Sequence, residues 1–261
     1  MSRKVLCIDI GNTNVVFGIS TDDWNNFEFK HFRITTNHLI TIDEVSLNLF
    51  SILNYFDVRR DEIFRVVISS VVPEVDVQFR YGILNVIGVE PVFVKPEDTG
   101  IRIEYNNINE IGSDRLVDAL AGKVLYGSDC IIVDTGTATT IDVLRDGAYL
   151  GGVIMPGIQT SLYAIFQKAS KIPKISLDTP KRVVGKTTEE CLRSGIILGL
   201  AKGIEGVINE IFKELNYSNF KVIFTGGLSD KIFELVNISN KFIDKELMLK
   251  GLKLIASRLE S

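Results

Sequence analysis

Two short polar segments, each directly after an apolar run, contain residues that could do chemistry with a phosphate-bearing ligand. The first is Asp9–Asn14, which follows Val5–Ile8. The second is Asp134–Thr140, which follows Cys130–Val133. Another apolar run comes after each turn, so both segments read as strand, tight polar turn, strand, with a carboxylate at the end of the first strand. The sequence therefore predicts two β-hairpins of similar design.

Both turns have side chains suited to phosphate oxygens and to a nearby cation. Glycine lets the backbone approach a ligand closely, and threonine, asparagine and backbone N–H groups donate hydrogen bonds to phosphate. A carboxylate at a strand end can hold a cation, directly or through water. The same residue types also occur in hairpin turns that bind nothing. Because Asp-x-Gly-x-Thr and its near copy stand at corresponding places in two similar halves, we favour a ligand that both halves share.

An acid and an arginine stand side by side before a helical segment in mid-chain, at Asp114 and Arg115. Asp114 could simply be the N-cap of that helix. An acid placed between two phosphate-binding halves could also accept a proton from an attacking hydroxyl, and Arg115 could bind a substrate carboxylate in forked geometry. The residues alone leave both interpretations open.

The segment Gly185-Lys186-Thr187 looks like the end of a P-loop, but the required first glycine falls on Pro180 and no apolar strand precedes it. We therefore reject a P-loop. Thr187 and Glu190 have the spacing of a capping box, which predicts the start of a helix. The hydroxyl of Thr188 would then lie at a helix N-terminus, where anionic or polar ligands also bind.

The spacing of apolar residues predicts the same order of elements in each half. After its hairpin the first half has a strand, a helix, a strand, a helix and a short strand, at Phe27–Ile34, Asp43–Phe56, Phe64–Val72, Val75–Ile87 and Val92–Val94. Thr41 or Asp43 can cap the first of these helices.

The second half repeats this order. Its strands are expected at Cys130–Val133, Thr140–Leu144, Ala148–Ile154 and Lys221–Thr225, and its helices at Ile158–Ala169, Thr187–Leu215, from Leu228 to Leu235, and after Asp244 to about Leu259. An apolar-faced helix, Arg115–Leu125, joins the halves without a linker. We expect two packed α/β domains, residues 1–112 and 113–261, with a ligand cleft between them.

Composition excludes several classes of protein. The 261 residues are 46% hydrophobic and 24% charged, with a net charge of −4, as in ordinary globular proteins. The pI near 5.4 disfavours a nucleic-acid partner. Three scattered cysteines and two histidines make a zinc site improbable. The N-terminal apolar run is too short for a signal peptide, and no apolar stretch is long enough to span a membrane, so we expect a soluble protein of a reducing cytoplasm.

Glycines recur every four residues within the long helical segment, at Gly195, Gly199 and Gly203, with Gly206 just beyond. Each glycine destabilises a helix by roughly 0.5–1 kcal/mol relative to alanine. Such a stripe indicates that something packs very close to it. The neighbour could be another helix of this chain or a partner subunit.

Together these motifs resemble the type III pantothenate kinases, which belong to the acetate and sugar kinase/Hsc70/actin superfamily. The resemblance runs essentially from end to end. It is carried by Asp9–Asn14 within Met1–Ile19, Ser69–Pro73, Gly112–Arg115, Val133–Thr140, Gly151–Gly157 and Thr225–Gly227.

The resemblance implies two ribonuclease-H-like (actin-like ATPase) domains with ATP in the cleft between them, bound together with Mg²⁺. The turn Gly226-Gly227 would lie on the adenosine side. The residues it assigns to ATP are Asp9, Ile10, Gly11, Asn12, Thr13, Asn14, Val15, Val16 and Thr137.

The same resemblance implies ATP-dependent phosphorylation of pantothenate to 4′-phosphopantothenate, the first step of coenzyme A biosynthesis. Asp114 would accept the proton, and Asp134 would be the ligand of a monovalent cation, potassium or ammonium. The family is homodimeric with substrate near the subunit interface, which favours a partner subunit as the neighbour of the glycine stripe. The pantothenate pocket would be lined by Tyr105, Gly112, Ser113, Asp114, Arg115 and Thr188.

This sequence departs from the family pattern at Ser113, often alanine, and at Ile108, often proline; both lie beside the substrate loop. Two other functions are compatible with the motifs. A kinase for another small hydroxyl compound, such as a sugar, would commonly carry further polar clusters or a Cys/His zinc motif. A nucleotide-binding transcription regulator would need a basic patch, which the acidic pI disfavours.

Overall fold

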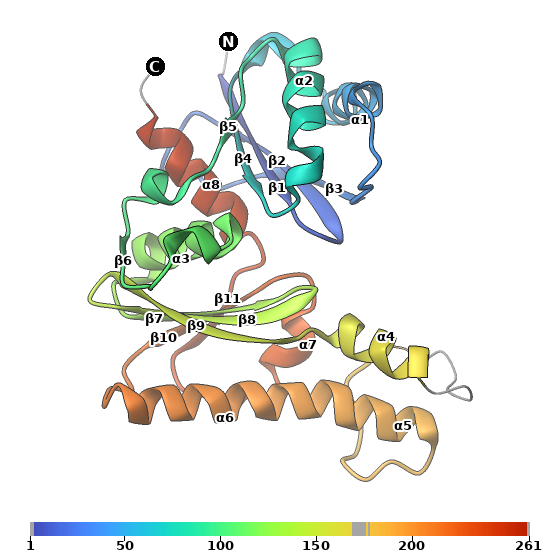
Figure 1. Cartoon of the computed structure of the whole chain (residues 1–261), viewed down its shortest axis with the longest axis vertical. Helices are drawn as coiled ribbons and strands as arrows, with labels where there is room; N and C mark the ends of the chain where they lie inside the picture. The colour runs from blue at the N-terminus through green and yellow to red at the C-terminus, as the bar shows by residue number, and fades with distance from the viewer. Residues whose placement is uncertain (1–2, 169–175, 177, 260–261) are drawn as a thin grey trace. The chain divides into compact units, whose positions relative to one another are not determined.

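The computed structural model describes residues 3–168, 176 and 178–259, which form two compact α/β units (Figure 1). The first unit contains the chain up to Arg102, Asn106–Ala121 and the residues from Glu246 onward; the second contains Ile103–Tyr105 and Gly122–Lys245. This division differs from the expected boundary between residues 112 and 113. The start of the central helix and the whole of the last helix belong to the first unit.

The first unit is built on a five-stranded sheet in the order β3-β2-β1-β4-β5. β2 pairs antiparallel with β1 and β3, whereas β1, β4 and β5 run parallel. The predicted hairpin is therefore confirmed, and β3 begins three residues later than Phe27. The strands are β1 Lys4–Ile10, β2 Asn14–Thr21, β3 Lys30–Thr35, β4 Ile63–Ser70 and β5 Val92–Phe93.

Helices cover both faces of this sheet. α1 (Ile42–Tyr55) and α2 (Asp76–Ile87) pack on one face and share its hydrophobic core. α8 (Leu247–Arg258) packs against β1 and β4, which explains why the apolar run of β1 is continuous rather than alternating. Thr41 caps α1 in a capping box with Glu44.

α8 belongs to the first unit because its side chains fit that unit closely. Gly18 in β2 leaves room for Leu249, whose Cδ atoms lie 2.8 Å from where a Cβ would stand. Gly251 lies against Val117 of α3 (Ser113–Tyr126), so closely that a side chain there would collide with the α3 backbone. The sequence pattern finds this helix correctly but does not show which unit it covers.

The second sheet repeats the plan of the first. Its strand order is β11-β10-β7-β8-β9-β6. Read from β9, the order β9-β8-β7-β10-β11 corresponds to β3-β2-β1-β4-β5 of the first sheet. The pair β7–β8 is the second predicted hairpin. The short strands β6 and β11, of two and three residues, were not predicted because so few residues show no periodicity. The strands are β6 Arg102–Ile103, β7 Cys130–Thr135, β8 Ala138–Arg145, β9 Ala148–Pro156, β10 Lys221–Thr225 and β11 Lys241–Ile243.

A long helical rod runs along one face of the second sheet (Figure 1). It is the predicted segment from Thr187 to Leu215, but a π-helical turn, Ser194–Leu198, interrupts it. Its apolar side packs on the sheet through residues such as Ile204 and Ile208. The predicted end of α4 at Ala169 lies outside the described residues. The helices described in the second unit are α4 Ile158–Lys168, α5 Thr188–Arg193, α6 Gly199–Glu214 and α7 Ser229–Phe233. The described part of the chain also has 3-10 turns at Arg60–Glu62, Pro73–Val75, Pro96–Thr99 and Ile108–Glu110.

One charged side chain of α8 is completely buried. Lys253 is 0% exposed, and its Nζ donates to Ser20 Oγ and Asp23 O, both at 2.8 Å, and to Asn26 O. Burial lowers the pKa of this ammonium group below its usual value. A fully buried lysine is rare unless it is paired, and here it connects α8 to the segment between β2 and β3.

Replacing Lys253 with methionine should lower the free energy of unfolding by about 2 kcal/mol, because its hydrogen-bond acceptors lose their buried donor. The change should also raise amide hydrogen exchange in residues 22–29. Urea unfolding followed by circular dichroism measures the first effect, and exchange mass spectrometry the second.

Lys213→Met is the matched control, since its side chain is 71% exposed and pairs only at the surface with Glu210. Surface pairs contribute about 0–1 kcal/mol. Equal losses of stability in the two variants would show that Lys253 has no special structural role.

Candidate active site

The turn of the first hairpin is fixed by hydrogen bonds within its own backbone and by hydrogen bonds from the segment after β3. Gly11 N donates to Asn14 O at 3.0 Å, and Thr36 donates through Oγ1 to Gly11 O at 2.6 Å and through its N–H to Thr13 O at 2.9 Å. Asn12 and Thr13 are exposed. The predicted phosphate loop is thus a fixed turn with an exposed polar tip, as close contact with phosphate oxygens requires.

Asp9 lies at the carboxyl end of β1, partly buried, opposite Val16 in β2 and Ser69 in β4. Because β1 and β4 are parallel, their carboxyl ends lie side by side. Ligands of open α/β sheets bind beyond such carboxyl ends. The carboxylate is therefore on the edge of the sheet where a ligand of the hairpin would be.

The segment with the candidate catalytic acid is attached to the same edge. The hydroxyls of Ser69 and Ser113 lie 2.9 Å apart, and Ser113 Oγ also contacts Ser70 O at 3.1 Å. Ser113 is the first residue of α3, so Asp114 and Arg115 follow directly in its first turn. The first unit thus brings the hairpin and Gly112–Arg115 to one place.

Asp114 is inside the helix rather than before it. Its Oδ1 accepts a hydrogen bond from Arg115 N at 2.8 Å. Gly112 adjoins this carboxylate so closely that a side chain at position 112 would push Oδ1 out of its present position. Asp114 thus lies in the first turn of α3, with its carboxylate bonded to the helix backbone.

Ser69 and Ser70 belong to the segment Ser69–Pro73, which carries part of the family resemblance, but neither was a predicted site residue. Ser70 Oγ donates to Asp76 Oδ1 at 2.6 Å, at the start of α2, and burial raises the pKa of Asp76 above its ordinary value. The signal in the sequence that could have indicated this role was a pair of adjacent serines at the end of a buried strand. Their function is to attach α2 and α3 to β4.

In the second unit, the hairpin turn is tied to the start of α4. Thr137 is exposed, and its carbonyl accepts from Gly157 N at 3.1 Å and from Thr160 Oγ1 at 2.6 Å. Gly157 lies against the carbonyls of Gly136 and Thr137 with no room for a side chain. The turn is therefore fixed, with the Thr137 side chain at its surface.

Asp134 stands at the end of β7, opposite Thr140 in β8 and Thr225 in β10. Gly226, which follows Thr225 in the chain, has φ +88°, and a side chain there would collide with Asp134 Oδ1. The Asp134 carboxylate thus lies close to the turn that follows β10. The described residues include no group of three or more His, Cys, Asp or Glu placed to bind a metal, so a cation here would need further ligands from backbone, water or substrate.

The two remaining substrate residues lie far apart within the second unit. Tyr105 follows β6 and is 37% exposed. Thr188 is the exposed first residue of α5, which Thr187 caps by accepting from Glu190 N at 3.2 Å. β6 and α5 lie at opposite ends of this unit (Figure 1). One chain therefore does not bring Thr188 to the Tyr105 end of its own second unit.

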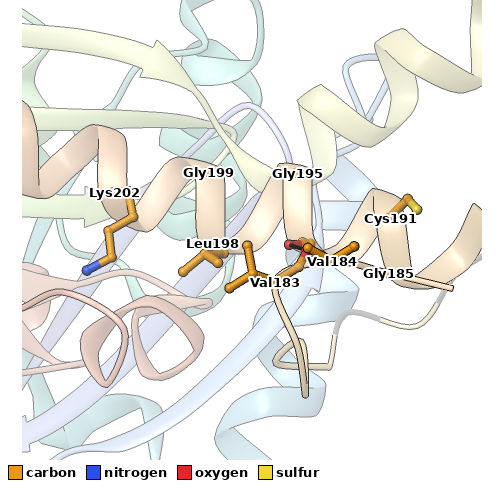
Figure 2. Close-up of a pocket in the computed structure, with 9 residues that line it drawn as sticks. Val183, Val184, Gly185, Cys191, Gly195, Leu198, Gly199 and Lys202 are labelled. Atoms are coloured by element: carbon orange, nitrogen blue, oxygen red, sulfur yellow. Dashed lines mark hydrogen bonds between the residues drawn. The ribbon is translucent and has the colours of Figure 1, made fainter.

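An apolar groove of about 490 Å³ runs along the helical rod from Cys191 to Lys202 (Figure 2). Val183 and Val184, which border it, are about 70% exposed, at 69% and 71%. A Cβ added to Gly195, Gly199 or Gly206 would meet no atom within 4 Å, whereas Gly203 faces Met155. Packing within the unit thus explains the glycine at position 203. It does not explain the other glycines of the stripe, which have open space beside them.

No helix in the described ranges is both long and apolar enough to cross a membrane. The cysteines are all free thiols. Burial raises the pKa of Cys7 and of Cys130 to about 12, so neither thiol is a nucleophile at neutral pH.

Solved structures share this fold. A conserved putative Baf family transcriptional activator from Campylobacter jejuni aligns with a TM-score of 0.58 and 21% identity over 96% of both chains. An inorganic polyphosphate/ATP-glucomannokinase from Arthrobacter aligns with a TM-score of 0.53 and 11% identity over 98% of this chain and all of the other. At these identities the likeness concerns the fold, and the two-unit architecture expected for actin-like ATPases and sugar kinases is confirmed.

Sequence comparisons are more specific. A type III pantothenate kinase of Persephonella marina is 38% identical over 95% of this chain and 96% of its own length. One from Desulfosudis oleivorans is 40% identical over 98% of this chain and all of its own. The family model for type III pantothenate kinase matches residues 5–210, and with these motifs in their expected places the chain belongs to the type III pantothenate kinase family.

Proposed function

We propose that the protein transfers the γ-phosphate of ATP to the 4′-hydroxyl of pantothenate, giving 4′-phosphopantothenate in the first step of coenzyme A biosynthesis. Membership of the family supports this activity. The observation that carries it in the structure is the attachment of the α3 start to β4, through Ser69 and Ser113, beside the Asp9 hairpin. A candidate acid and a candidate phosphate loop share one edge of one sheet.

The hairpin Asp9–Val16 would hold the phosphates of ATP, and Thr137 of the second hairpin would make a further contact. Asp9 is placed to hold Mg²⁺, directly or through water, since Mg²⁺ usually binds one or two carboxylates together with substrate phosphates. When bound, Mg²⁺ neutralises phosphate charge. Positioning and charge neutralisation carry most of the acceleration in phosphoryl transfer.

Pantothenate would lie against Tyr105 and the turn Gly112–Arg115. Arg115 can bind the pantothenate carboxylate in forked geometry. Asp114 would accept a hydrogen bond from the 4′-hydroxyl, orient it in line with the γ-phosphate and take its proton. The contact with Arg115 N holds this carboxylate in a defined orientation.

We assign the monovalent cation, potassium or ammonium, to Asp134. Its carboxylate lies close to Gly226, where a side chain would collide with it, and this glycine keeps the carboxylate accessible to an ion. The Gly226-Gly227 turn would then border the adenosine of ATP.

We propose that the active form is a homodimer in which Thr188 contacts pantothenate bound to the partner. Thr188 and Tyr105 lie at opposite ends of the second unit (Figure 1), so a threonine from a second copy is needed to complete the pocket. The apolar groove along Cys191–Lys202 and the open glycines Gly199 and Gly206 of α6 offer the contact surface.

The reaction would take place in the cytoplasm, without a nucleic-acid or membrane partner. The free cysteines and acidic pI fit this assignment. ADP release on adding pantothenate, with and without potassium, tests the proposal directly. Release with glucose but not with pantothenate would favour a sugar kinase, and retention of DNA without turnover would favour a regulator.

Replacing Asp114 with asparagine should lower kcat about 100-fold or more while ATP binding stays nearly unchanged, because the amide cannot take the hydroxyl proton. Coupled ADP release gives kcat, and isothermal titration gives ATP affinity. Glu110→Gln, an exposed acid in the preceding 3-10 turn, is the control and should keep full activity. Normal turnover of the Asp114 variant would remove it from the catalytic role.

Replacing Asp134 with alanine should abolish the stimulation of activity by potassium, because the carboxylate ligand of the cation is lost. The measurement is the initial rate against potassium concentration at constant ionic strength. Asp230→Asn changes an acid in α7 that pairs at the surface with Lys245 and should keep the normal potassium curve. An unchanged curve for the Asp134 variant would place the cation elsewhere.

Mixing two inactive variants, Asp114→Asn and Thr188→Arg, should restore part of the activity if Thr188 acts across the interface. Subunit exchange then creates one site with a normal Asp114 from one chain and a normal Thr188 from the other. Activity is measured after mixing under conditions of exchange, with analytical ultracentrifugation to confirm the dimers.

In a pocket made by one chain, every mixed dimer would keep one defect in each site. The mixture would then have no more activity than the average of its components. That result, with dimers present, would assign Thr188 to its own chain or to no site.

A further inference from the structure

The backbone next to Tyr105 is fixed by the sheet of the second unit. β6 lies at the edge of this sheet beside β9, and Glu104 N donates to Tyr149 O at 2.8 Å. The chain is thus anchored one residue before Tyr105. The ring itself is 37% exposed, so burial alone does not fix its orientation.

A glycine in β9 makes space for the Tyr105 ring. β9 has one extra residue between Tyr149 and Gly151, which pair with the consecutive residues Leu144 and Val143 of β8. Gly151 has φ +112°, and a Cβ on it would lie 3.2 Å from both Cδ2 and Cε2 of Tyr105. The ring therefore lies over this bulge, so close that a side chain at position 151 would require it to shift by about a few tenths of an ångström.

A second aromatic ring borders the same space. The rings of Tyr105 and Tyr149 have centroids 6.4 Å apart at an angle of 52°. Tyr149 is 0% exposed. The partly exposed ring thus rests beside a buried one, at a distance usual for interacting aromatic pairs.

The buried tyrosine is in turn fixed by a buried carboxylate. Tyr149 Oη donates to Asp142 Oδ1 at 2.7 Å, and Thr140 Oγ1 donates to Asp142 Oδ2 at 3.0 Å. Asp142 is only 1% exposed. Hydrogen bonds to a charged group are short and strong, and removing one leaves a buried polar group unsatisfied.

We propose that Gly151, Tyr149 and Asp142 are positioning residues, which hold the Tyr105 ring in the orientation that binds pantothenate. This inference rests on the proposed function, which assigns Tyr105 to the substrate pocket. Gly151 supplies the space, Tyr149 supplies the side wall, and Asp142 keeps that wall in place. Specificity for the substrate thus depends on residues of the β8–β9 hairpin that do not touch it.

Gly151→Ala should raise KM for pantothenate about tenfold, because the new methyl group displaces the ring, and leave KM for ATP within about twofold. Tyr149→Phe keeps the ring, loses its bond to Asp142 and should raise the same KM about threefold. This milder variant keeps the test available if Gly151→Ala does not fold.

Gly147→Ala is the matched control. Gly147 lies in the turn of the same hairpin at φ +71°, where an added Cβ would meet only the flexible end of Lys123. It should lower Tm as Gly151→Ala does and leave KM for pantothenate unchanged. A similar rise in KM for both variants would show that general strain in the hairpin is responsible and would overturn the inference.

Tyr105→Ala, alone and combined with Gly151→Ala, separates the inference from the proposed function. If Gly151 acts through Tyr105, the second change should add less than about twofold to KM for pantothenate. Full additivity, with a clear effect of Tyr105→Ala alone, would overturn the inference and leave the proposed function intact. If Tyr105→Ala has no effect on KM for pantothenate, Tyr105 is not part of the pocket and the inference is wrong. If the unmodified protein shows no turnover with pantothenate, the proposed function itself is wrong.

Discussion

The contacts of Ser113 Oγ with the Ser69 hydroxyl and with Ser70 O attach the start of the central helix to the first sheet. Together with the close packing of Gly251 on Val117 they give the acid that follows Ser113 a defined relation to the hairpin on the neighbouring strand. Ser69 and Ser113 are small and close to rigid backbone, one at the end of a buried parallel strand and one in the first turn of a helix.

The two sheets have the same strand order, yet their first hairpins have different neighbours. In each sheet an aspartate is the second-to-last residue of the first strand of the hairpin, and it pairs with a residue of the neighbouring parallel strand. Beside Asp9 that strand ends in Ser69 and Ser70, which attach helices. Beside Asp134 it ends in Thr225 and Gly226, whose backbone approaches the carboxylate. A duplicated plan thus gives two carboxylates of similar position and different surroundings.

Local patterns predicted much of this fold. Alternation and helical spacing found the hairpins and most helices, and the cap at Thr41 followed from its spacing to Glu44. Contacts between distant parts of the chain were not predictable. Nothing local shows that α8 covers β1, that β6 adds an edge strand, or that Tyr149 reaches Asp142 across a bulge. The candidate site was named from motifs, but the residues that support it depend on these distant contacts.

The position of α8 has a consequence for how the protein folds as it is synthesised. The ribosome makes β1 first and α8 only after the whole of the second unit, so one face of the first sheet stays uncovered during most of translation. Loop closure over so many residues is slow compared with local pairing. The second unit, whose elements are nearly contiguous in sequence, can therefore complete its core before the first. The unit that contains the Asp9 hairpin is thus begun before the second unit, but the face of its sheet that α8 covers is buried only after α8 has been made.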